Sequence, residues 1–194
     1  MTKKSIISGI TGMTGSHMAD YLLENTNQQI YGMIRRVANP NYKNINHILN
    51  NPRFKLVIGD LSDSHSIENL VTDIKPNFFF NFSAQSHVHI SWEVPEQTFD
   101  INSTGLIRIL ESVRKHCPTC RVYQANSSEM FGDVLYSPQD LEHPFRPQSI
   151  YAASKCAAHH ICRVYRESYR LYVISGILFN HESPRRSLNF LPRR

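Results

Sequence analysis

Tyr151 and Lys155 lie four residues apart in the stretch SIYAASK, and together they could perform acid–base chemistry on a hydroxyl group. Residues at this spacing share one face of a helix. A lysine ammonium, together with any further positive charge nearby, favours the phenolate form of a neighbouring tyrosine and lowers its pKa from about 10 toward working pH. Tyr151 would then take a hydroxyl proton as hydride leaves the carbon. The pair is weak evidence alone, because the same spacing also arises by chance.

Ser127 and Glu129 form a second candidate acid–base pair, in the stretch YQANSSEMFG. If strand geometry persists through these residues, the two side chains point to the same face, because neighbours alternate along a strand. A hydroxyl and a carboxylate aimed together at the carboxyl end of a parallel sheet can donate and accept protons. The alternative is a serine-rich turn with a solvated glutamate.

Gly9, Gly12 and Gly15 recur at intervals of three in SGITGMTGSH, directly after the apolar run at residues 5–8. At a turn from strand to helix they suit the pyrophosphate of a dinucleotide. The first permits a tight turn, the second lets the backbone approach the phosphates, and the third lets the helix pack on the strand. The start of the helix also presents free N–H groups to the anion. An ordinary glycine turn is the alternative.

The order of apolar runs and helical patterns determines where these residues lie. Short runs rich in Ile, Val, Phe and Tyr predict buried strands at residues 5–8, 29–34, 55–59, 77–82, 121–125 and 172–178. Amphipathic segments predict helices near 13–25, 63–74, 97–116 and 150–170. Asp63 and Ser149 are placed as N-caps. The alternation predicts an α/β fold, a doubly wound, mostly parallel Rossmann-like sheet with helices on both faces.

Arg35 and Arg36 follow the second predicted strand, about twenty residues beyond Gly15. An enzyme that uses NAD would place Asp or Glu there to hold the ribose 2′-hydroxyl. A guanidinium suits a 2′-phosphate instead, so the sequence favours NADP over NAD. Asp60, at the end of the third strand, is a candidate partner for the adenine, although aspartate is common in such loops.

Composition restricts the class of protein. The chain has 194 residues, of which 41% are hydrophobic and 19% charged, and this predicts one well-buried globular domain. Lys and Arg number 21 against 16 for Asp and Glu, which suits an anionic partner such as a nucleotide. No basic stripe interleaved with aromatic residues indicates nucleic-acid binding. We find no bilayer-spanning run and no signal peptide, and therefore expect a cytoplasmic protein that does not bind membranes.

The four cysteines are expected to be reduced thiols, because no secretory signal precedes them. The CPTC stretch at 117–120 has redox or zinc spacing, but it falls between a helix and a strand and lacks a second pair. On a helix, Cys156, His159, His160 and Cys162 would spread over several faces. We therefore predict no metal site.

The glycine loop with Tyr151 and Lys155 resembles the extended short-chain dehydrogenase/reductase superfamily, and six stretches resemble, within it, the GDP-mannose 4,6-dehydratase family. They are GMIRR (32–36), GDLSD (59–63), AQSHV (84–88), SSEMFG (127–132), YAASK (151–155) and GILFNHESPRR (176–186). They follow the expected order over nearly the whole chain. The last stretch is the most specific, because the epimerases and dTDP-glucose dehydratases of the superfamily lack it.

The resemblance implies a role for each matching position. The positions that would contact NADP are Gly9, Thr11, Gly12, Met13, Thr14 and Gly15 at the pyrophosphate, Arg35 and Arg36 at the 2′-phosphate, Asp60 and Leu61 at the adenine, and Ala84, Gln85, Ser86, Tyr151, Lys155, His181 and Arg185 elsewhere along the cofactor. The catalytic positions would be Ser127, Glu129, Tyr151 and Lys155, with Lys155 supporting Tyr151.

The reaction implied by the resemblance is redox-neutral overall. Tyr151 removes the proton of the sugar 4-hydroxyl while NADP accepts hydride from carbon 4, and the new ketone acidifies the hydrogen on carbon 5. Glu129 removes that proton, water leaves from carbon 6 and the hydride returns there, so that GDP-mannose becomes GDP-4-keto-6-deoxymannose. A simple reductase or epimerase would not need the Glu129 carboxylate. The resemblance also implies a homodimer or homotetramer assembled through the helices at 97–116 and 150–170.

The end of the chain departs from the family pattern. Family members continue past Arg194 with a region that helps to bind the sugar nucleotide, while here Ser187 replaces an expected glycine and Pro192 interrupts the lead into a helix. We therefore expect an NADP-binding Rossmann-like domain over residues 1–180 and the truncated start of a substrate-binding region over 181–194. A non-catalytic NADP-binding module and another nucleotide-sugar epimerase or dehydratase are the alternatives.

Overall fold

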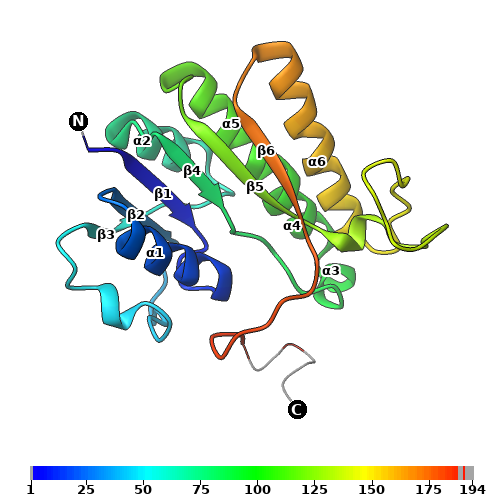
Figure 1. Cartoon of the computed structure of the whole chain (residues 1–194), viewed down its shortest axis with the longest axis horizontal. Coiled ribbons are helices and arrows are strands. Elements are labelled where there is room, and N and C mark those ends of the chain that lie inside the picture. Colours follow the sequence, from blue (N-terminus) through cyan, green and yellow to red (C-terminus); the bar gives the residue numbers. More distant parts are fainter. Residues whose placement is uncertain (1, 188–189, 191–194) are drawn as a thin grey trace.

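A six-stranded parallel sheet forms the centre of the computed structural model, which describes residues 2–187 and 190 (Figure 1). The strands are β1 (Lys4–Ser8), β2 (Gln29–Ile34), β3 (Phe54–Ile58), β4 (Phe78–Asn81), β5 (Arg121–Ser127) and β6 (Val173–Leu178). Their order across the sheet is β3-β2-β1-β4-β5-β6, with parallel pairing throughout. The order reverses between β1 and β4, so the predicted doubly wound fold is confirmed. Such folds bind ligands at this switch point, beyond the carboxyl ends of the strands.

Helices cover both faces of the sheet, with α1 on one face and α2, α5 and α6 on the other (Figure 1). The α-helices are α1 (Met13–Asn25), α2 (Ser64–Ile74), α3 (Ile90–Glu93), α4 (Pro95–Phe99), α5 (Gly105–His116) and α6 (Ile150–Tyr169). The shorter elements are the 3-10 turns η1 (Asn46–Ile48) and η3 (Ser128–Met130) and the π-helical segment η2 (Asp100–Thr104). Among the described residues, no helix is both long enough and apolar enough to cross a membrane.

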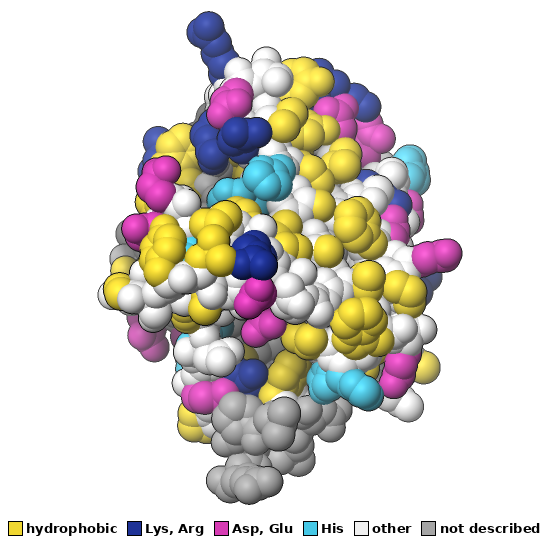
Figure 2. Space-filling model, turned by 90° about the vertical axis from the view of Figure 1, so that its right-hand side faces the viewer, with side chains coloured by type: hydrophobic (Ala, Val, Ile, Leu, Met, Phe, Trp, Pro, Cys, Tyr) yellow, Lys and Arg dark blue, Asp and Glu magenta, His cyan; other side chains and the backbone are white. Residues whose placement is uncertain are grey.

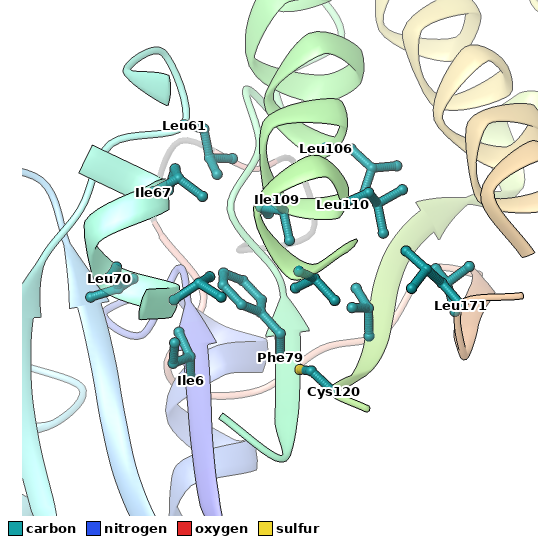
Figure 3. Close-up of a cluster of buried hydrophobic side chains, with 14 of the residues drawn as sticks. Ile6, Leu61, Ile67, Leu70, Phe79, Leu106, Ile109, Leu110, Cys120 and Leu171 are labelled. Carbon is teal, nitrogen blue, oxygen red and sulfur yellow. The ribbon is translucent and has the colours of Figure 1, made fainter. Parts of the chain in front are cut away.

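Alternate residues of the strands fill two apolar layers. Ile6 and Phe79 face the layer under α2, α5 and α6, whereas Ile7 and Ile30 face the layer under α1. Figure 3 shows Phe79 between Ile6 of β1 and Ile109 of α5, and all three side chains are fully buried. This packing fixes the strands relative to one another, and therefore fixes the loops that leave their carboxyl ends.

The helix predicted at 97–116 is longer than expected and contains an irregularity. Helical structure continues from α4 through the π-helical η2 into α5. The wider turn of η2 buries Asn102 and Ser103 against α6, where both reach Ser154. Asn102 Nδ2 donates to the Ser154 hydroxyl (3.0 Å), and the Ser103 hydroxyl donates to the Ser154 carbonyl (2.9 Å). π-Helical turns of this kind are frequent at functional sites.

Asp63 and Ser149 are N-caps, as the sequence predicts. Asp63 accepts a hydrogen bond from the His65 N–H (2.9 Å), and the Ser149 hydroxyl accepts one from the Ala152 N–H (3.0 Å). A cap of this kind stabilises a helix by about 1 kcal/mol. The cap on α6 is important for function, because the first turn of this helix carries Tyr151.

Candidate active site

The three glycines of the first loop lie at the turn from β1 into α1, where the backbone requires them. Gly9 has a φ of +66°, and a Cβ there would lie 2.9 Å from backbone atoms of Phe82. The Gly12 N–H donates to the Gly9 carbonyl (3.0 Å), which closes the turn. A Cβ on Gly15 would overlap that same carbonyl oxygen. Since α1 begins without a side-chain cap, its first N–H groups are available to an anion.

Gly15→Ala is expected to destabilise the fold by about 1–3 kcal/mol, because the added methyl group forces the backbone of the loop apart. Urea unfolding of the chain measures this loss. The control is Gly12→Ala, where the added Cβ meets its nearest neighbour, the Gly9 carbonyl oxygen, at 3.1 Å and needs only a small adjustment. We expect a smaller loss for that variant, and equal stabilities of Gly15→Ala and the unsubstituted chain would contradict the close approach described above.

The carboxyl ends of β2 and β3 carry the residues predicted at the adenosine end of the cofactor. Arg35 and Arg36 are exposed directly after β2, and within the described part of the chain neither forms an ion pair. The Asp60 carboxylate accepts from the N–H and the hydroxyl of Ser62 (2.9 and 2.8 Å), so it also shapes its own turn. The Leu61 side chain is buried in the core, and its carbonyl oxygen accepts a hydrogen bond from Arg108 (2.7 Å).

The loop after β4 holds Ala84, Gln85 and Ser86, and Gln85 is fixed within it. The Gln85 N–H donates to Asn102 Oδ1 (2.9 Å), and Asn102 Nδ2 donates back to the Gln85 carbonyl (3.0 Å). Ala84 is half-buried, whereas Ser86 is exposed. Asn102 of η2 therefore clamps this loop to the helix layer. The sequence analysis missed that role, because the amphipathic pattern of the helix gives no signal for a π-helical turn.

The segment that follows β6 crosses back over the glycine loop, which brings His181 and Arg185 to the first half of the chain. A ring nitrogen of His181 lies 3.0 Å from the Thr14 hydroxyl, and Arg185 forms an ion pair of 2.5 Å with Asp20 on α1. His17 adds a contact of 2.7 Å to the Ser183 hydroxyl. Both predicted residues therefore lie beside the predicted pyrophosphate loop.

Asn44 joins this segment to the glycine loop from a third element, the connection between β2 and β3. Its side-chain amide donates to the carbonyl oxygens of Thr11 (3.0 Å) and Arg185 (3.1 Å). Sequence reasoning missed Asn44, His17 and Asp20, because each acts through partners distant along the chain. The predicted effect of Pro192 lies outside the described residues.

Lys155 is buried beneath Tyr151 in the first turns of α6. It is 3% exposed, and its ammonium donates to the Ala125 carbonyl of β5 (2.8 Å). The same ammonium lies 5.8 Å from the centre of the Tyr151 ring. Burial penalises the charged form and lowers the pKa of Lys155 to about 8. Tyr151 and Lys155 thus share one helix face, as their spacing predicts.

The pKa of Tyr151 shifts in the direction opposite to our expectation. Burial raises this pKa, because a phenolate loses solvation there, and the negative charge of Glu129 raises it further. The hydrogen bond from Ser127 opposes the rise. Lys155 directs its ammonium to a carbonyl, and in the protein alone it does not overcome the effect of burial. Both predicted acid–base partners, Ser127 and Glu129, nevertheless act on Tyr151.

Glu129 lies on a different element from the strand that would have aligned it with Ser127. Strand geometry ends at Ser127, and Glu129 lies on the 3-10 turn η3, so the assumption of a continuing strand was wrong. The Ser127 hydroxyl caps the turn by accepting from the Glu129 N–H (3.2 Å). Ser127 is buried and Glu129 is exposed. The arrangement therefore combines a buried hydroxyl, a buried phenol and a carboxylate open to solvent.

The four cysteines are free thiols, and burial raises the pKa of each. The pKa of Cys120 rises to about 12, which disfavours the reactive thiolate. Within residues 2–187 and 190, no group of three or more His, Cys, Asp or Glu side chains is arranged to hold a metal ion.

Comparison with protein families gives a match over residues 6–194 to the model of the GDP-mannose 4,6 dehydratase family. GDP-mannose 4,6 dehydratase 1 of Arabidopsis thaliana is 46% identical over 99% of this chain and 55% of its own length. The GDP-mannose 4,6-dehydratase of Yersinia enterocolitica is 45% identical, over 99% of this chain and 53% of its own length. The GDP-mannose 4,6 dehydratase of Homo sapiens is 40% identical, over 98% of this chain and 53% of its own length. The chain thus spans about half the length of these relatives.

Solved structures resemble the chain in fold. A dTDP-glucose 4,6-dehydratase from Streptomyces venezuelae with NAD bound has a TM-score of 0.88 at 22% identity, over 98% of this chain and 59% of its own. The UDP-glucose 4-epimerase of Thermus thermophilus, a complex with NAD, has a TM-score of 0.76 at 27% identity, over 89% and 53%. The sheet and its helices are therefore those of nucleotide-sugar dehydratases and epimerases.

Proposed function

The chain belongs to the GDP-mannose 4,6 dehydratase family, and we propose that it binds NADP and carries the acid–base groups that convert GDP-mannose to GDP-4-keto-6-deoxymannose. The observation that carries the proposal is the convergence of Ser127, Glu129 and Tyr151 beside the carboxyl end of β5, with the Lys155 ammonium beneath them. Proton transfer and dehydration need these groups, whereas the family relationship supports the choice of GDP-mannose as substrate.

Each side chain has a separate task in this proposal. Tyr151 takes the proton of the sugar 4-hydroxyl, and Ser127 stabilises the phenolate by the hydrogen bond that lowers its pKa. The nicotinamide, when bound, accepts a hydride from carbon 4 and returns it to carbon 6. Glu129, which is exposed, removes the proton that the new ketone acidifies on carbon 5. Loss of hydroxide from carbon 6, with a proton, completes the elimination of water.

NADP is the proposed cofactor because the end of β2 carries cations without a carboxylate. A dinucleotide suits the turn into α1, because the three glycines allow the tight backbone turn there and the uncapped start of the helix offers N–H groups to a pyrophosphate. Arg35 and Arg36 are exposed where the ribose 2′-position would lie, and both can pair with a 2′-phosphate. NAD has an uncharged hydroxyl at this 2′-position, so it should bind to these guanidinium groups more weakly than NADP.

We expect NADP to raise the melting temperature of the chain more than NAD at equal concentration, because a ligand of the native state adds RT ln(1 + [L]/Kd) to stability. Arg35→Ala should reduce the shift with NADP and leave the shift with NAD unchanged. Lys3→Ala removes an exposed cation at the opposite end of the sheet and serves as the control. Equal shifts with the two cofactors would contradict the choice of NADP.

We also propose that the protein is a homo-oligomer assembled through the helices predicted at 97–116 and 150–170, with the adjoining α3 and α4. Large apolar side chains are exposed on these helices: Ile90 (40%), Trp92 (59%), Phe99 (43%) and Val164 (47%). Figure 2 shows hydrophobic side chains between charged ones on the side of the molecule that carries α6. Burial between two copies would remove this apolar surface from water. Sedimentation of the protein tests this, and a monomer at all concentrations would contradict it.

A further inference from the structure

A row of buried polar side chains crosses the sheet directly below the candidate active site. Ser8 of β1 pairs in register with Asn81 of β4, and Asn81 pairs with Gln124 of β5. Their side chains all face the layer of α5 and α6, as Ile6, Phe79 and Val122 do two residues earlier on the same strands. The three polar residues are 0%, 2% and 1% exposed. They therefore form a polar layer between the apolar core and the catalytic groups.

Hydrogen bonds run through this row in one direction. The Ser83 N–H donates to the Ser8 hydroxyl (3.1 Å), which donates to Asn81 Oδ1 (2.5 Å). Asn81 Nδ2 donates to Gln124 Oε1 (2.6 Å), and Gln124 Nε2 donates to the Ala125 carbonyl (3.0 Å). A backbone donor at one end and a backbone acceptor at the other fix the orientation of both amides, because flipping either one would place two acceptors face to face.

The chain of hydrogen bonds ends at the oxygen to which Lys155 donates. Ala125 O accepts from Gln124 Nε2 at 3.0 Å and from the Lys155 ammonium at 2.8 Å. The titratable groups near that ammonium are Tyr151, whose ring lies 5.8 Å away, and the buried thiol of Cys162. Neither supplies a fixed negative charge, so the Ala125 carbonyl is the main polar partner of the buried charge.

We propose that Ser8, Asn81 and Gln124 are positioning residues that set the interaction of Lys155 with the Ala125 carbonyl. The inference rests on the proposed function in one respect, since Lys155 matters to catalysis only if Tyr151 is the base. Buried amides cost free energy unless every donor and acceptor is satisfied, and apolar residues could fill the same row. The row also joins the loops after β1 and β4 to β5, and so connects the two cofactor loops to the catalytic lysine.

The physical consequence concerns the pKa of Lys155. Two donors share one carbonyl oxygen, and the positive end of the Gln124 amide lies beside the ammonium, which disfavours the charged form. If the Gln124 amide no longer donates to the Ala125 carbonyl oxygen, that oxygen becomes wholly available to Lys155, and the charged form of Lys155 becomes more stable. Loss of the chain should therefore raise the pKa of Lys155, from about 8, by about one unit, the effect of one altered hydrogen bond to a charged group.

The test is an NMR titration of the lysine Cε resonances in the ligand-free chain, with Lys155 assigned from a Lys155→Met variant. Asn81→Leu keeps the approximate shape and removes the bond that orients the Gln124 amide, so that this amide can turn away from the Ala125 carbonyl, and we expect the pKa of Lys155 to rise. Gln124→Met removes the last donor directly and should give a rise at least as large. It decides the question if Asn81→Leu does not fold. Ser112→Ala removes a buried hydroxyl on α5 that has no hydrogen-bond partner among the described residues.

The Ser112→Ala control should leave the titration of Lys155 unchanged. An unchanged pKa in a folded Asn81→Leu or Gln124→Met chain would overturn the positioning role. Because the titration needs neither cofactor nor substrate, its outcome is independent of whether the chain binds NADP or removes water from GDP-mannose.

Discussion

Glu129→Gln is expected to lower the proposed rate of water loss from GDP-mannose by about 10²- to 10⁴-fold, the usual contribution of a positioned general base, and to leave NADP binding unchanged. Glutamine keeps the size of the side chain and cannot accept the proton from carbon 5. The carboxylate is exposed on η3, away from the glycine loop, so its loss does not disturb the cofactor site. Chromatography of the sugar nucleotides measures turnover, and the melting shift with NADP measures binding.

The matched control for this prediction is Glu142→Gln, which neutralises another exposed carboxylate, in the loop before α6. It should leave both turnover and NADP binding unchanged. Unaltered turnover in Glu129→Gln would refute the role of Glu129 as the base, and a loss of NADP binding would show that its effect is structural.

Lys155→Met is expected to stabilise the folded chain by about 3 kcal/mol near neutral pH, while it removes the support of Tyr151. The folded-state pKa of about 8 lies below the ordinary 10.5. Below about pH 8 the native state therefore carries the full cost of a buried ammonium. Between the two values the unfolded state binds more protons, so stability rises with pH and the cost disappears as pH increases. Methionine fills the space without that cost at any pH.

Urea unfolding at about pH 7 and about pH 10 measures this difference. The gain of Lys155→Met should be largest at the lower pH and mostly lost at the higher one, because native Lys155 is then neutral. Lys43→Met changes an exposed lysine and should show neither a gain nor a pH dependence. A destabilised Lys155→Met chain at about pH 7 would mean that the bond to Ala125 contributes more than burial costs.

The positions of the strands and of helix α1 could be predicted because local patterns of apolar and polar residues determine them. The ranges 13–25 and 29–34 agree with α1 and β2, and the other strands agree within two residues at each end. Apolar runs marked the buried strands, and Asp63 and Ser149 marked two helix starts through their capping bonds. The glycine loop followed from the same reasoning, because only residues without a Cβ fit its backbone.

What the sequence could not show depends on contacts between distant residues. Glu129 was aligned with Ser127 on the condition that strand geometry continued past residue 125, because nothing local reveals that the Ser127 hydroxyl caps a 3-10 turn. In the protein alone the pKa of Tyr151 rises rather than falls for a similar reason, since burial is a property of the assembled fold. The side chain of Asn102 joins η2 to the loop after β4 by a hydrogen bond from the Gln85 N–H, and no sequence pattern in either segment predicts this hydrogen bond.

GDP-mannose with deuterium at carbon 4 gives the most direct test of the proposed function. The protein with NADP should produce GDP-4-keto-6-deoxymannose with the deuterium on carbon 6, because the hydride removed from one carbon returns to the other within the same site. Unchanged GDP-mannose in the presence of a protein that binds NADP, or a product without the deuterium, would contradict the account.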